Sequence, residues 1–132
     1  MSVGNLGARQ AGPTVTVDGD AANRTPWGYM QFVCNGVRFA DAQQTVGYVE
    51  INAGAKNPRH LHPNSDEVLY LIAGELDHSL GDATVHLTPG MAIHIPQGVA
   101  HDAHNRGNET ARMIVSYPTT DRQVVMLEAG QE

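Results

Sequence analysis

Short apolar segments separated by glycine and proline are the sequence feature that most limits how this chain can fold. The 132 residues include 14 Gly and 7 Pro, too many for a helical bundle of this length. Residues 45–51 (TVGYVEI) alternate, with apolar residues on one face of an extended strand and Tyr48 and Glu50 on the other. This pattern predicts an all-β sandwich or barrel.

The same pattern gives a series of expected strands. We expect them at residues 14–17, 29–34, 37–40, 45–51, 67–73, 90–98, 111–117 and 123–127. Residues 73–87 (AGELDHSLGDATVHL) are expected to form a hairpin, because Gly81-Asp82 favours a two-residue hairpin turn. Residues 67–73 (EVLYLIA) are apolar on both faces, which is typical of a central strand.

Length and composition indicate one globular domain. A chain of this size can bury roughly two thirds of its unfolded surface. The hydrophobic content of 41% and the charged content of 17% are ordinary for a globular protein. Residues 1–13 are rich in glycine and polar residues, so we expect a flexible N-terminal segment there and a single domain over residues 14–132.

Charge and cysteine content restrict the partners and the compartment. The net charge is −6, and Lys56 is the only lysine among eight basic residues, which argues against a phosphate-binding surface for nucleic acid. Cys34 is the only cysteine, which excludes an intrachain disulfide and suits a reducing compartment. No segment resembles a signal peptide or approaches the roughly 20 apolar residues of a membrane span. We therefore expect a cytoplasmic protein that binds neither nucleic acid nor membranes.

The segment HLHPNSDE, residues 60–67, contains three potential metal ligands. Residues two apart on an extended strand share a face, so His60 and His62 would lie roughly 7 Å apart along the backbone and could reach one ion. A turn at residues 63–66 would return Glu67 on the adjoining strand, facing the same point. The alternative is a polar edge with exposed histidines and a solvated glutamate, which we find less plausible for all three together.

Two groups of residues have a regular spacing. The first is glycine, five residues, His-x-His, four residues, glutamate, six residues and glycine: Gly54, His60, His62, Glu67 and Gly74. The second is glycine, five residues, Pro-x-Gly, two residues, histidine, three residues and asparagine: Gly90, Pro96, Gly98, His101 and Asn105. With both motifs (54–74 and 90–105) complete in residue type and spacing, the chain resembles the cupin family.

This resemblance implies a fold and a metal site. The fold would be the cupin jelly-roll barrel, also called a double-stranded β-helix. His60, His62, Glu67 and His101 would bind one divalent metal inside the barrel. Nitrogen and oxygen ligands of this kind suit Fe, Mn, Ni, Cu or Zn better than Ca. A homodimer is also expected, because a second subunit could cover the outward face of the apolar strand at residues 67–73.

The resemblance leaves the reaction open. A divalent ion with one carboxylate and three neutral imidazoles carries a charge of about +1, which favours a small anionic or enolisable molecule that binds through two oxygens. An enzyme is expected, either dioxygenase-like or another metal-dependent oxidoreductase or lyase. The alternatives are a non-catalytic metal-binding or ligand-binding module, and a cupin isomerase or polyketide cyclase.

Three further polar residues are candidates for the site, although none belongs to a family motif. His78 shares a strand face with Leu76 and Leu80, so it is either a core histidine or a catalytic acid or base. Arg38 and Tyr48 come from expected strands beside the cavity and are candidates for substrate binding. Arg38 could bind a substrate carboxylate.

Overall fold

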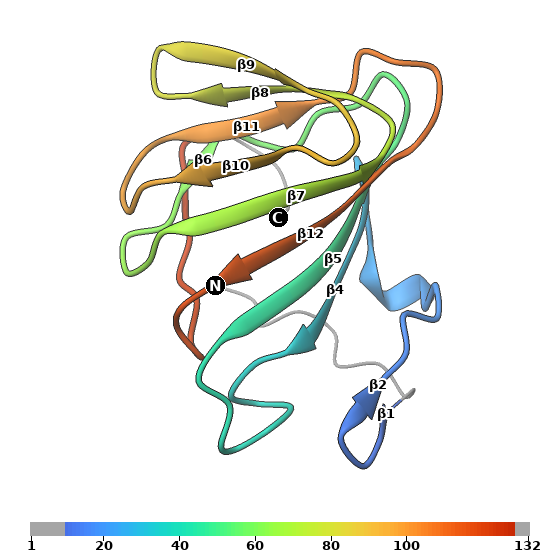
Figure 1. Ribbon diagram of the computed structural model, residues 1–132, viewed down its shortest axis with the longest axis vertical. Coiled ribbons are helices and arrows are strands. Elements are labelled where there is room, and N and C mark those ends of the chain that lie inside the picture. Colours follow the sequence, from blue (N-terminus) through green and yellow to red (C-terminus); the bar gives the residue numbers. More distant parts are fainter. Residues whose placement is uncertain (1–9, 129–132) are drawn as a thin grey trace.

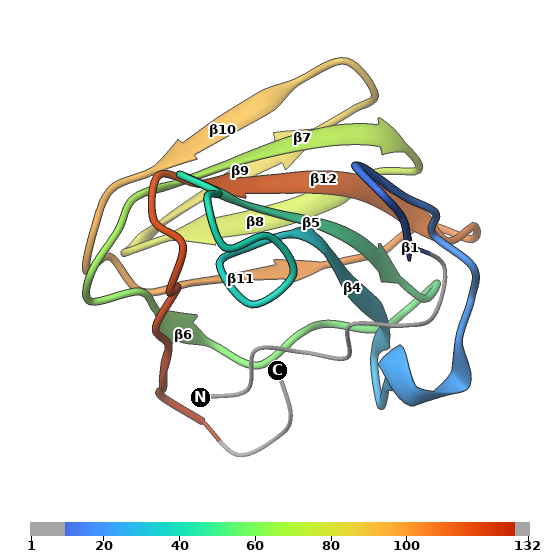
Figure 2. The ribbon, with the colours of Figure 1, turned by 90° about the horizontal axis from the view of Figure 1, so that it is seen from below.

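The computed structural model describes residues 10–128 and shows two antiparallel sheets that face each other (Figure 1 and Figure 2). The only helical element in this range is the 3-10 turn η1 (Ala21–Asn23). No helix among these residues is long and apolar enough to cross a bilayer. The expected all-β jelly-roll is therefore confirmed.

The larger sheet has six strands in the order β10-β7-β12-β5-β4-β3. Every neighbouring pair in it is antiparallel. Its strands are β3 (Arg24–Thr25), β4 (Gly28–Cys34), β5 (Thr45–Ile51), β7 (Glu67–Ala73), β10 (Ala92–Ile95) and β12 (Ala111–Tyr117). Strands β5, β7 and β12 match the bounds expected from sequence.

The smaller sheet has five strands in the order β13-β6-β11-β8-β9. Its strands are β6 (His60–Leu61), β8 (Leu76–Leu80), β9 (Ala83–Leu87), β11 (His101–His104) and β13 (Val125–Met126). Strands β8 and β9 form the expected hairpin around Gly81-Asp82. A separate two-stranded ribbon pairs β1 (Gln10–Ala11) with β2 (Thr14–Val15).

The hydrophobic core lies between the two large sheets and takes residues from both. On β7 the inner residues Leu69 and Leu71 are buried, whereas Val68, Tyr70 and Ile72 are 42%, 47% and 45% exposed. This alternation is the expected consequence of a strand that is apolar on both faces but covered on only one.

Three local expectations differ from the structure. Residues 37–40 form turns rather than a strand, because the Asn35 side chain accepts hydrogen bonds from the backbone N–H groups of Val37 and Arg38. The strands expected at 14–17, 90–98 and 123–127 are shortened to β2, β10 and β13, respectively. Strands β6 and β7 do not form a hairpin: the turn between them carries the chain from one sheet to the other.

The flexible segment expected at residues 1–13 falls mostly on residues 1–9, which lie outside the described residues. Of the remainder, Gln10 and Ala11 pair with β2.

Candidate metal centre

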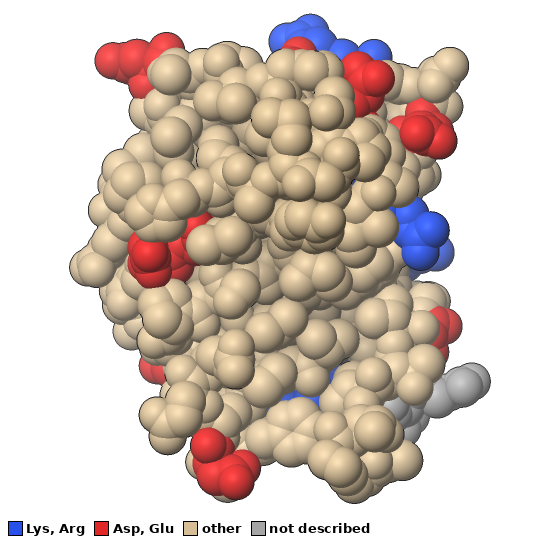
Figure 3. Space-filling view, in the orientation of Figure 1, with Lys and Arg blue, Asp and Glu red and all other residues tan. Residues whose placement is uncertain are grey.

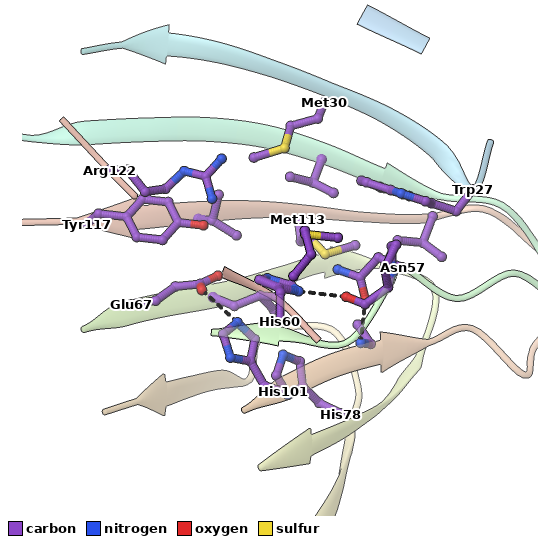
Figure 4. Close-up of a pocket in the computed structure, with 17 residues that line it drawn as sticks. Trp27, Met30, Asn57, His60, Glu67, His78, His101, Met113, Tyr117 and Arg122 are labelled. Carbon is purple, nitrogen blue, oxygen red and sulfur yellow. Dashed lines mark hydrogen bonds and ion pairs between the residues drawn. The ribbon is translucent and has the colours of Figure 1, made fainter. Parts of the chain in front are cut away.

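The four metal-ligand candidates come together from both sheets. His60 begins β6, His62 follows that strand, and His101 begins β11 directly opposite His60. Glu67 begins β7 on the facing sheet. All four side chains are buried, and Figure 4 shows Glu67, His60 and His101 converging on one region. The structure thus brings all four metal-ligand candidates into one cluster.

Backbone carbonyl groups fix the orientation of the three imidazole rings. The Nδ1 atoms of His60, His62 and His101 lie 2.7, 2.8 and 2.9 Å from the carbonyl oxygens of Pro58, Gln123 and Val99, respectively. A neutral ring that donates from Nδ1 has its lone pair on Nε2. The ligand atoms of the three rings all lie within 4.8 Å of one another, so these residues could hold a metal ion.

The carboxylate of Glu67 completes the cluster. Its Oε1 atom lies 3.2 Å from Nε2 of His62 and 3.2 Å from Nε2 of His101. These three buried atoms have no hydrogen-bond partner of suitable geometry in the described part of the chain. With Nδ1 donating, each of them is an acceptor, and acceptors this close repel unless a proton or a cation lies between them. The arrangement therefore fits a divalent transition metal.

The pKa shifts of the buried ligand candidates have different physical causes. Burial, reinforced by the nearby His101, lowers the pKa of His60 to about 3, so His60 is neutral at neutral pH. Burial would lower the pKa of His101 as well, but the adjacent Glu67 carboxylate outweighs it and raises that pKa. The pKa of Glu67 is held well below its usual range by His101 and His62, against the effect of burial.

A cavity adjoins the cluster and has a largely apolar wall. The volume open to water-sized molecules is about 40 Å³. This exceeds the roughly 10–15 Å³ that a single water molecule needs. Its lining includes Glu67, His60 and His101 (Figure 4). Among its apolar lining residues are Trp27, Met30, Leu69, Met113, Val115 and Met126.

His78 lies beside the cluster and lines the cavity. Its ring stacks on that of His101 at a centroid distance of 5.7 Å and an interplanar angle of 13°. Its Nδ1 atom lies 2.8 Å from the carbonyl oxygen of Ser79. Burial lowers the pKa of His78, so it is neutral at neutral pH. The position suits a proton-transfer residue, and a catalytic role for His78 stays a prediction.

Three polar residues of the cavity were missed from the sequence: Asn57, Tyr117 and Arg122. Tyr117 ends β12, and Arg122 lies five residues further along, in the C-terminal segment of residues 118–128. Burial and the charge of Glu67 raise the pKa of Tyr117, so its hydroxyl stays protonated. The alternation of β12 could have indicated that Tyr117 faces inward with Met113, but no sequence signal marks Arg122.

Arg38 and Tyr48 lie away from the cavity. On β5, Val49 lines the cavity, and strand alternation turns the neighbouring Tyr48 to the opposite face. There the Tyr48 hydroxyl donates to Glu50 and accepts from Arg112, at 2.7 and 3.0 Å. The Arg38 guanidinium donates to the side chain of Gln10 at 3.0 Å. Neither residue is among those that line the cavity.

Comparison with known proteins identifies the family. A family model described as "Cupin domain" matches residues 47–117, more than half of the chain. The chain belongs to the cupin family. The match spans both motifs completely and includes all four metal-ligand candidates of this cupin.

Several curated relatives come from Streptomyces. This cupin is 36% identical over 69 residues to "Tetracenomycin polyketide synthase protein TcmJ" of Streptomyces glaucescens, a match that covers 52% of this chain and 46% of that protein. It is 28% identical over 92 residues to "Polyketide synthase CurC" of Streptomyces cyaneus, which covers 70% and 60%. The matches thus span about half of each relative's length.

Solved structures support the same fold. Oxalate decarboxylase from Bacillus subtilis aligns with a TM-score of 0.74 and 20% identity, covering 80% of this cupin and 29% of that chain. The oxalate decarboxylase of Lactobacillus farciminis aligns with a TM-score of 0.72 and 22% identity, covering 77% and 32%. At these identities, the likeness concerns the fold alone.

Proposed function

We propose that this cupin is a metal-dependent enzyme that acts on small enolisable oxygen compounds of the polyketide type. The observation that carries this proposal is the convergence of three imidazole Nε2 atoms and the Glu67 carboxylate beside a cavity. His60, His62, Glu67 and His101 would hold one divalent transition metal from the series Fe, Mn, Ni, Cu and Zn.

The protein would orient the substrate, exclude water from it with an apolar cavity wall, and supply a group that transfers a proton. A bound divalent metal supplies a Lewis acid for a bidentate oxygen anion, and a redox-active one can also support oxygen chemistry. The apolar residues Trp27, Met30 and Met113 would exclude water around such an anion. His78 would move a proton to or from the substrate carbon or oxygen.

The names of the relatives favour one substrate class. Two of them carry "polyketide synthase" in their names, and poly-β-carbonyl compounds form enolates that chelate metals. A cyclisation or isomerisation through such an enolate is therefore our preferred reaction. Dioxygenase-like chemistry stays the second candidate, because the donor set also suits iron, manganese and nickel.

One experiment separates these reactions from simple binding. The metal content of protein purified without added metal would be measured first, followed by turnover of 1,3-diketones and aromatic polyketide enols. Product formation without oxygen consumption would support cyclisation or isomerisation, and stoichiometric oxygen uptake would support a dioxygenase. If the metal-loaded protein turned over none of these compounds, the binding-module alternative would replace the enzyme.

Replacing His78 by phenylalanine should reduce turnover while leaving the metal in place. Phenylalanine retains an aromatic ring against His101 but cannot carry a proton, so kcat should fall by about 100-fold or more. Metal content measured on the same sample should match that of the wild type. His94, which is exposed and paired with Asp66 at 2.8 Å, provides a matched control in His94→Phe. Unchanged kcat in His78→Phe would assign His78 to the core.

We also propose that two copies of this cupin associate through the outer face of β7. Val68, Tyr70 and Ile72 form an exposed apolar row there, and Figure 3 shows that this side of the molecule carries few charged groups. A symmetric pair would bury the same row on both copies. Cytoplasmic localisation is a further proposal, since a reducing compartment suits the free thiol of Cys34.

Light scattering should therefore give about twice the chain mass of 14.2 kDa at micromolar concentration. Tyr70→Glu should shift the mass to that of one chain, because the new charge would be buried at the interface. Val85→Glu on β9, in the other sheet, is the matched control and should stay dimeric. A wild-type mass of 14.2 kDa would contradict the dimer.

A further inference from the structure

The cavity beside the metal-ligand candidates is much smaller than the molecules proposed to react there. Its volume of about 40 Å³ holds roughly three water molecules, since each needs roughly 10–15 Å³. Pockets that bind small organic ligands typically measure about 300–1,000 Å³. A 1,3-diketone can therefore reach the cluster only if part of the cavity wall moves.

The parts of the wall differ in how firmly they are held. Strands β5, β8, β11 and β12 all line the cavity, and each pairs with a neighbouring strand on both sides. Moving any of them would break a sheet. The C-terminal segment of residues 118–128 contributes Arg122 and Met126 to the wall. Its strand β13 lies at the edge of the smaller sheet and pairs with β6 through two residues.

Hydrogen bonds at the surface hold the middle of the C-terminal segment. The Asn64 side chain donates to the carbonyl oxygen of Asp121 at 2.8 Å and accepts from the backbone N–H of Gln123 at 3.1 Å. Both bonds are exposed, so water can replace them at little cost. The carbonyl oxygen of Gln123 also lies 2.8 Å from Nδ1 of His62, so this segment orients one metal-ligand candidate.

An ion pair at the surface holds the end of the same segment. The Glu128 carboxylate accepts a hydrogen bond from the backbone N–H of Arg59 at 2.8 Å and pairs with the ammonium group of Lys56. The side chains of Lys56 and Glu128 are 37% and 41% exposed, and an exposed ion pair stabilises a structure only weakly. Local opening begins in segments that are held by exposed hydrogen bonds of this kind.

We propose that the C-terminal segment of residues 118–128 is a gate that swings away from the cavity to admit a ligand to the metal centre. This inference rests on the proposed function, because the closed cavity excludes a substrate of the proposed size. Figure 2 shows the segment, in red, passing from the end of β12 in the larger sheet to the side of β6 in the smaller one. Its outward movement would withdraw Arg122 and Met126 from the wall and break only the pairing of β13 with β6.

The rate of ligand entry tests the gate. Zn²⁺-loaded protein, chosen because zinc is redox-inert, would be mixed rapidly with excess pentane-2,4-dione, and the absorption of the chelated enolate would be followed. If opening precedes binding, the observed rate levels off as the dione concentration rises, and the limiting value is the rate of opening.

Two variants weaken the gate at separate anchors. Asn64→Ala removes the two hydrogen bonds of the middle, and Glu128→Ala removes the ion pair and the hydrogen bond of the end. Each should raise the limiting rate about 2- to 5-fold, the effect expected when weak surface contacts are lost. Arg106→Ala removes a surface ion pair with Asp77 at 2.9 Å, away from the segment, and is the matched control that should keep the wild-type rate.

Hydrogen exchange tests the same gate without metal or ligand. The amides of Gln123 and Leu127, which donate to Asn64 and to the carbonyl oxygen of Arg59, should exchange faster than those of β12 in metal-free protein. Because the segment opens as one unit, Asn64→Ala should speed exchange at Leu127, and Glu128→Ala should speed it at Gln123, each about 2- to 5-fold. Exchange in β12 should stay unchanged in both variants.

The outcomes separate the gate from the proposed function. A binding rate that rises in proportion to dione concentration and is equal in all variants would overturn the gate and leave the metal site standing. If the dione did not bind to the Zn²⁺-loaded wild type, the proposed substrate class would fail, and hydrogen exchange would decide the gate. Exchange at Gln123 and Leu127 as slow as in β12, or faster only at the altered anchor, would overturn it.

Discussion

His101→Ala should lower the affinity for a divalent transition metal by more than about 100-fold. Loss of a group that merely orients a metal ligand already costs roughly 10- to 100-fold, and this change removes a ligand candidate outright. His101 also contacts Glu67 at 3.2 Å, so the substitution would leave that buried carboxylate with His62 as its remaining neighbour in the cluster. The measurement is metal content per chain after dialysis against a chelator of graded strength.

The matched control for this change is His104→Ala. His104 ends the same strand, β11, and is not among the histidines that converge on the cluster. It should retain the metal stoichiometry of the wild type. Full stoichiometry in His101→Ala under the same chelator would show that the site does not use this residue.

Gly28→Ala should destabilise the fold by about 3 kcal/mol or more, a large part of the roughly 5–15 kcal/mol typical of a domain. Gly28 begins β4, where an added Cβ atom would lie 2.0 Å from the backbone oxygen of Glu50. That oxygen belongs to β5, which pairs with β4 along its whole length, so relief requires the two strands to separate. Chemical denaturation followed by circular dichroism would measure the free energy of unfolding.

Gly47→Ala provides the comparison within the same pair of strands. Its added Cβ atom would lie 3.1 Å from Cγ2 of Val115, a side-chain methyl group that can shift by a few tenths of an ångström. We expect a loss of about 1 kcal/mol. Equal losses of the free energy of unfolding in the two variants would contradict this prediction, because they would show that separating β4 from β5 at Gly28 costs no more than moving the Val115 methyl group.

The parts of the site that were predictable depend on local spacing. The His-x-His pair could be placed on one face because extended residues two apart point the same way, and the motif likeness then added His101. The fold was predictable for a similar reason, since alternation along residues 45–51 indicates a strand covered on one face and the apolar residues 67–73 indicate a central strand. These signals lie within a few residues of one another in the chain.

The parts that were missed depend on which sheet a segment joins. A turn after His62 was expected to form a hairpin, but turn-forming residues do not determine whether the next strand pairs with the last or crosses to a facing sheet. Arg122 reaches the cavity only because the C-terminal segment returns alongside β6, a contact between residues about 60 positions apart. Arg38 was a candidate because residues 37–40 were expected to form a strand beside the cavity, but the Asn35 side chain accepts hydrogen bonds from the backbone N–H groups of Val37 and Arg38 and holds this segment in a turn.

The return of the C-terminal segment also affects the order in which the protein folds. The ring of His62 is fixed by the carbonyl oxygen of Gln123, 61 residues later, and β6 is paired on one side by β13. Closing so long a loop costs entropy that only the finished contacts repay, so such pairings form late. During synthesis, the barrel strands emerge before the residue that orients His62. If the site holds a metal as proposed, its complete set of oriented ligands would form only in the last stage of folding.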